Sequence, residues 1–194
     1  MMETSLKVDL KLNNNGHLKL LLWLGIAGMI MLFAALTSAY VVMEGRTSWM
    51  HFSLPATFSI STAVIILSSI TMNMALGATK KGNAKKASSA LLMTLSLGIL
   101  FGSLQFFGWH ELYANNVVFA GTNSNPAGSF IYLFTGLHIF HLFGGLIALG
   151  ITIYKNSKQV YNAGNMLGLE LCASYWHFLD GLWVYLFLFL LLVR

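Results

Sequence analysis

Five long apolar runs dominate the chain, and short polar segments separate them. The runs cover about residues 20–43, 54–78, 90–113, 128–154 and 169–193. A helix rises about 1.5 Å per residue, so roughly 20 apolar residues are enough to cross about 30 Å of hydrocarbon. The strands of a membrane β-barrel would instead alternate apolar and polar residues. The pattern therefore predicts an all-α polytopic membrane protein, a bundle of five transmembrane helices.

Composition supports a membrane protein with a simple domain organisation. Hydrophobic residues make up 57% of the chain and charged residues 9%, whereas about a quarter of a soluble domain is charged. We expect a cytoplasmic N-terminal segment, residues 1–19, and a single membrane domain, residues 20–194. The net charge of +5 comes mainly from lysines placed between apolar runs. It therefore indicates orientation in a membrane, and we expect no nucleic-acid partner.

The basic residues predict how the helices cross the membrane. With five spans, nine lysines fall on one side: Lys7, Lys11, Lys19, Lys80, Lys81, Lys85, Lys86, Lys155 and Lys158. Only Arg46 and Arg194 fall on the other side. Basic residues in short loops are retained in the cytoplasm. We therefore expect the N-terminus inside and the C-terminus outside.

Two groups of polar side chains fall inside the predicted spans, where ionisable groups are costly. The fourth run contains His138 and His141, and the fifth contains Glu170, His177 and Asp180. Helical spacing places the members of each group on one face. The two spans run antiparallel, so residues of similar depth can meet. We expect Asp180 to lie near His138 and His177 near His141.

Three interpretations of this cluster are open. Polar groups can hydrogen-bond between helices and fix their register. Two histidines and a carboxylate can bind iron or zinc, as in a membrane metalloenzyme. Histidines and carboxylates at depth can also relay protons, as in a small transporter or proton-conducting protein. The absence of a convincing internal repeat argues against a transporter.

Three further residues are candidates for packing between helices. Gly145 follows His141 by one turn, and a small residue there lets a neighbouring backbone approach. Gln105, in the outer half of the third run, is expected to bond across helices. Trp176 lies too deep to belong to an interfacial aromatic belt, so we expect it to be buried.

The fifth run carries a long and specific motif, Tyr175-Trp176-His177-Phe178-Leu179-Asp180-Gly181-Leu182-Trp183-Val184-Tyr185-Leu186-Phe187. It resembles the signature of subunit III of haem-copper oxidases, the family of cytochrome c and quinol oxidases. Glu170 and Gln105 match the same family. So does a second motif, Thr135-Gly136-Leu137-His138-Ile139-Phe140-His141, followed by Gly145.

The resemblance implies a short, five-helix bacterial form of subunit III, a multi-pass protein of the inner (plasma) membrane. Such a subunit has no catalytic residue, metal site or cofactor of its own, and haem and copper are expected in partner subunits. It packs beside the catalytic subunit I, contacts other oxidase subunits and holds phospholipid in a cleft between helices. It supports assembly and stability of a proton-pumping respiratory oxidase that reduces oxygen to water. The complex can join a larger respiratory supercomplex.

Two positions depart from the family pattern. Met29 stands where the family usually has a glutamate in the matching helix, and Gly108 where a glutamate often follows the glutamine of the third span. Both changes weaken the case for an acidic proton relay or proton-uptake role. They favour a register and packing role for the surviving polar groups. The electron donor, cytochrome c or quinol, is not encoded here because donor sites lie on other subunits.

Overall fold

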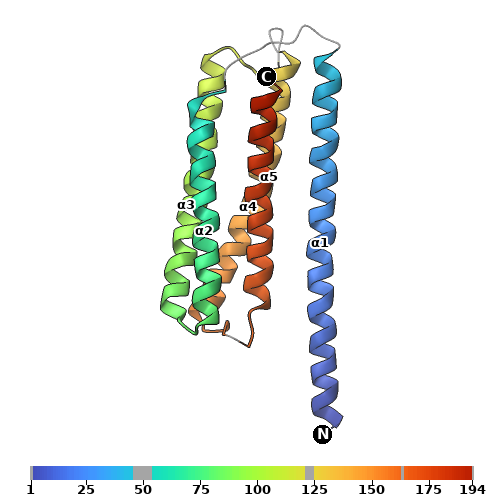
Figure 1. Cartoon of the computed structure of the whole chain (residues 1–194), viewed down its shortest axis with the longest axis vertical. Helices are drawn as coiled ribbons and strands as arrows, with labels where there is room; N and C mark the ends of the chain where they lie inside the picture. Colours follow the sequence, from blue (N-terminus) through green and yellow to red (C-terminus); the bar gives the residue numbers. More distant parts are fainter. Residues whose placement is uncertain (1, 46–53, 121–124, 163, 194) are drawn as a thin grey trace.

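Five helices make up the computed structural model, which describes residues 2–45, 54–120, 125–162 and 164–193 and gives side chains from Gly16 onward. The helices are α1 (Met2–Glu44), α2 (Ala56–Lys80), α3 (Ala84–Ala114), α4 (Pro126–Ser157) and α5 (Leu167–Leu192). They run alternately up and down (Figure 1). Within the described ranges, the only strand-like pairing is an isolated bridge between Asn162 and Asn165.

All five helices are long and apolar enough to cross a membrane, the span of α1 being Gly16–Glu44. The prediction of an all-helical membrane protein with five transmembrane helices is therefore confirmed. Some ends differ from those expected. Helix α1 begins at Met2 and so includes most of the expected N-terminal segment. Helix α3 begins at Ala84 rather than near residue 90, because the Asn83 side chain accepts a hydrogen bond from the Lys86 amide at 3.1 Å and so caps the helix.

Helices α2 to α5 form the main bundle, and α1 stands at its edge. Helix α2 packs along α3, α3 against α4, α4 against α5, and α2 also against α5, which closes a four-helix bundle. Helix α1 contacts α4 and α5 but, within the described residues, neither α2 nor α3 (Figure 1). Large side chains fill the interior of the bundle, with Phe101, Trp176 and Trp183 almost fully buried.

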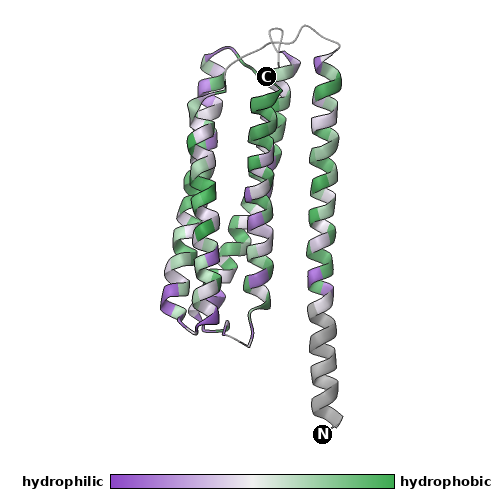
Figure 2. Cartoon of the chain, viewed as in Figure 1, coloured by the Kyte–Doolittle hydropathy of each residue, from purple (hydrophilic) through white to green (hydrophobic). Residues whose placement is uncertain are grey.

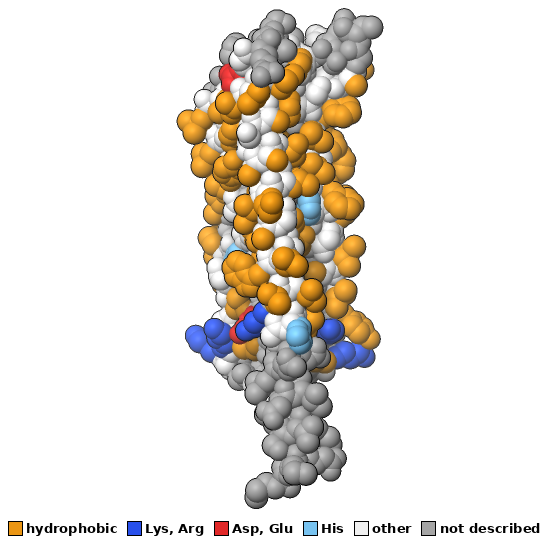
Figure 3. All heavy atoms as spheres, turned by 90° about the vertical axis from the view of Figure 1, so that its right-hand side faces the viewer, with side chains coloured by type: hydrophobic (Ala, Val, Ile, Leu, Met, Phe, Trp, Pro, Cys, Tyr) orange, Lys and Arg blue, Asp and Glu red, His pale blue; other side chains and the backbone are white. Residues whose placement is uncertain are grey.

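Hydrophobic residues occur along every helix (Figure 2), and the face of the molecule seen in Figure 3 is apolar over most of its length. Lysines gather at one end of the described surface (Figure 3). We call this the lysine end, defined by Lys19, Lys80, Lys81, Lys85, Lys86, Lys155 and Lys158. Arg46, Arg194 and the side chains of Lys7 and Lys11, which also entered the orientation argument, lie outside the described residues.

Candidate functional site

The two buried tryptophans of α5 face α2. The indole Nε1 of Trp176 donates to the Ser68 hydroxyl at 2.9 Å, and that of Trp183 donates to the Thr62 hydroxyl at 3.0 Å. Residues seven apart lie on nearly the same face of a helix, so the two indoles bond to α2 two turns apart. Each such bond contributes about 1 kcal/mol net, and a buried donor left alone costs more. The pair of bonds therefore fixes the register of α5 against α2.

His177 extends this contact toward the surface. The Ser69 hydroxyl lies 2.6 Å from His177 Nδ1, and His177 Nε2 lies 3.2 Å from Asn73 Oδ1. An amide oxygen only accepts, so in this arrangement Nε2 carries the proton and Nδ1 accepts from Ser69. His177 thus bonds to α2. The expected pairing with His141 of α4 is not formed, because both ring nitrogens of His177 bond to α2.

His141 has other neighbours. Its Nδ1 lies 2.7 Å from the Leu137 carbonyl of its own helix, and its ring centroid is 6.0 Å from that of Phe33 in α1. The α5 residue that reaches it is Tyr175, whose hydroxyl donates to the His141 carbonyl at 3.1 Å. This bond joins α4 to α5 through a backbone acceptor. The histidine ring takes no part in it.

His138 and Asp180 are both buried, and neither bonds to the other. His138 is fully buried, with its ring centroid 5.1 Å from Trp183 and 5.8 Å from Phe101. Its ring nitrogens have no hydrogen-bond partner among the described residues. The Asp180 side chain is 5% exposed, and its carboxyl oxygens likewise have no hydrogen-bond partner among the described residues. The expected pairing of the two groups is therefore not formed, and aromatic rings lie against the imidazole instead.

The five ionisable residues therefore do not form one cluster. His177 lies at the α2–α5 contact, His138 and Asp180 are in the interior, and His141 is beside α1. Glu170 lies in the first turn of α5 and is partly exposed. Among the residues that the structure describes, no three His, Cys, Asp or Glu side chains are grouped so that they could hold a metal ion.

Helix α2 uses other hydroxyls to bind α3. Gln105 Nε2 donates to the Ser61 hydroxyl at 2.9 Å, which is the cross-helix bond expected of this glutamine. The hydroxyls of Thr71 and Thr94 lie 2.8 Å apart. We call the five partners on α2 the hydroxyl seam; they are Ser61, Thr62, Ser68, Ser69 and Thr71. The seam was not predicted from the sequence, although Ser61 and Ser68, like Thr62 and Ser69, recur at the seven-residue spacing of one helix face.

Trp176 is held between two glycines. A Cβ on Gly98 of α3 would lie 2.7 Å from Cη2 of Trp176. A Cβ on Gly145 of α4 would lie 3.0 Å from Leu179 Cδ1 and 3.4 Å from Trp176 Cζ3. The distances of 2.7 and 3.0 Å are tighter than ordinary carbon contacts. The bundle thus closes around one indole because two neighbouring helices lack a side chain there.

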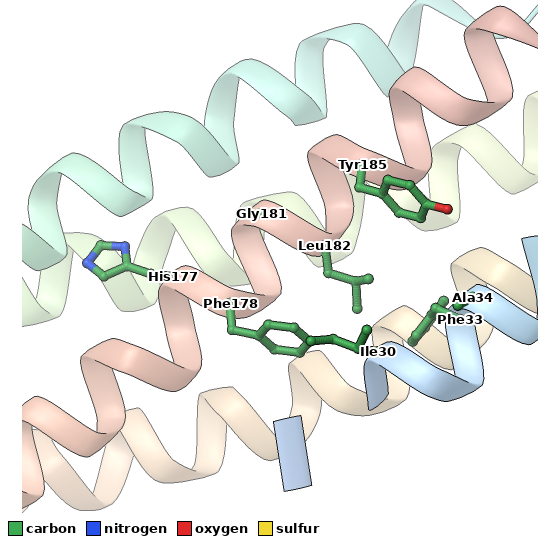
Figure 4. A pocket seen from close by; sticks show the side chains of 8 residues that line it. All are labelled: Ile30, Phe33, Ala34, His177, Phe178, Gly181, Leu182 and Tyr185. Carbon is green, nitrogen blue, oxygen red and sulfur yellow. The ribbon is translucent and has the colours of Figure 1, made fainter. Parts of the chain in front are cut away.

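A groove of about 470 Å³ lies between α1 and α5 (Figure 4). Its walls are mostly apolar and include Ile30, Phe33, Phe178 and Leu182. Tyr185 also lines it, and its hydroxyl lies 3.1 Å from the Thr37 hydroxyl of α1. The groove exists because α1 packs against the bundle only along part of its surface.

The fold and the site are those of a polytopic helical membrane protein. Many polar side chains within its helices form hydrogen bonds to a neighbouring helix. The family model "Cytochrome c oxidase subunit III" matches residues 47–193. This match covers most of the chain, including the α5 motif and the seam. The chain belongs to the cytochrome c oxidase subunit III family.

Relatives from bacteria and animals agree with this. A probable cytochrome c oxidase subunit 3 of Nocardia farcinica is 28% identical over 181 residues, 90% of this chain and 86% of that protein. One from Rickettsia felis is 34% identical over 132 residues, 67% of this chain and 45% of that protein. The cytochrome c oxidase subunit 3 of Dugong dugon is 32% identical over 128 residues, 66% and 47% respectively. The chain thus spans about half the length of several curated relatives that it matches.

Proposed function

We propose that this protein is the non-catalytic subunit III of a proton-pumping haem-copper terminal oxidase. Its role is to support the assembly and stability of the catalytic subunit I, which with other subunits carries the haem and copper. The observation that supports this most strongly is the α5 motif within a family match over residues 47–193. Four polar residues of that motif bond to neighbouring helices, which suits an accessory subunit; they are Tyr175, Trp176, His177 and Trp183.

The same arrangement gives little support to a transporter or proton conductor. A relay needs polar groups linked in a continuous path across the bilayer. Here His141 and Glu170 are separated from the α2–α5 contact, and the His138 ring is enclosed by Phe101 and Trp183. The pairs that do bond, such as Ser69 with His177, join helices.

The proposal includes an orientation and a location. Lysines at one end of a helical bundle favour that end in the cytoplasm, so the lysine end would face inward in a bacterial plasma membrane. The N-terminus would then be inside and the C-terminus outside. Reporter enzymes fused within residues 81–83 should give a cytoplasmic signal, and an external signal there would reverse the orientation.

A phospholipid is the expected occupant of the groove between α1 and α5. The walls of the groove are mostly apolar, and side chains such as Phe178 and Leu182 suit an acyl chain (Figure 4). Delipidation of the purified complex should release a stoichiometric phospholipid. Filling the groove with Gly181→Phe should reduce the amount retained.

Co-purification tests the proposed function directly. The tagged chain should be purified from its own membranes in mild detergent and an absorption spectrum recorded. Haem bands together with a large polytopic partner would support the proposal. A chain that purifies alone and colourless would contradict it, and proton flux and metal analysis of the isolated chain would then be the appropriate assays.

A further inference from the structure

We draw no further inference here: the strongest candidate, the cavity of about 280 Å³ at the lysine end that is lined by Asn156, Gln159 and Asn162 among others, carries nothing, because none of its lining side chains has a buried polar atom without a partner that would show what occupies it.

Discussion

At the scale of single residues, the signature of α5 is explained mainly by hydrogen bonds and close packing. Trp176 and Trp183 each bond to a hydroxyl of α2, and Trp176 also fills the space left by two glycines. Burying an indole is favourable only if its N–H finds an acceptor. The tryptophans and the hydroxyl seam therefore depend on each other.

Removing one acceptor from the seam tests this dependence. Ser68→Ala should leave the Trp176 indole N–H buried without its 2.9 Å partner and should cost about 1–3 kcal/mol. Thermal unfolding of the purified protein in detergent, followed by tryptophan fluorescence, measures the loss. Ser96→Ala is the control, because Ser96 is exposed and bonds only to the Leu92 carbonyl of its own helix. If the two variants unfold at the same temperature, the seam does not stabilise the protein.

A single methyl group tests the packing of Trp176. In Gly98→Ala the new Cβ would lie 2.7 Å from a buried ring carbon. Overpacking of this kind costs about 1–3 kcal/mol, so the midpoint of unfolding should fall. Gly150→Ala adds the same methyl group where no atom lies within 4 Å and should be neutral or slightly stabilising. Equal stability of Gly98→Ala and the unmodified protein would show that the indole can move aside.

Asp180 leads to the opposite expectation. Its carboxyl is buried without a hydrogen-bond partner among the described residues, and replacing a buried, unpaired polar group by an apolar one of similar size can be neutral or stabilising. We therefore expect Asp180→Leu to keep or raise the unfolding temperature of the purified protein. A loss of more than about 2 kcal/mol, the scale for breaking a real buried pair, would reveal a partner of Asp180 that this structure does not contain.

At the scale of helices, the sequence predicts the number of helices and their class, because continuous apolar runs are a strong signal. It predicts helix ends less well. Residues near Lys85 look like a loop by polarity, yet they are helical because Asn83 caps α3. The packing of α5 against α4 was predicted, but its hydrogen bonds to α2 were not. Periodicity shows which residues share a face but not which neighbour that face meets, and α5 packs against α2 as well as against α4.

At the scale of the whole molecule, four helices form the closed bundle, while α1 stands at its margin. This arrangement separates two roles. The hydroxyl seam and the glycines around Trp176 hold the subunit together, whereas the α1–α5 groove is the surface that we propose for lipid. Changes inside the bundle should therefore alter how long the complex survives, and should leave the chemistry carried out by other subunits unchanged.

Turnover and inactivation of the intact oxidase containing Ser68→Ala test this account most directly. Oxygen consumption should be recorded from the first turnovers until activity is lost, beside the unmodified complex. The account predicts an initial rate within about twofold of the unmodified complex, together with faster inactivation, because a structural bond is lost and no reacting group is changed. An immediate, large fall in the initial rate, with the complex still intact, would contradict it and place the α2–α5 contact in the reaction itself.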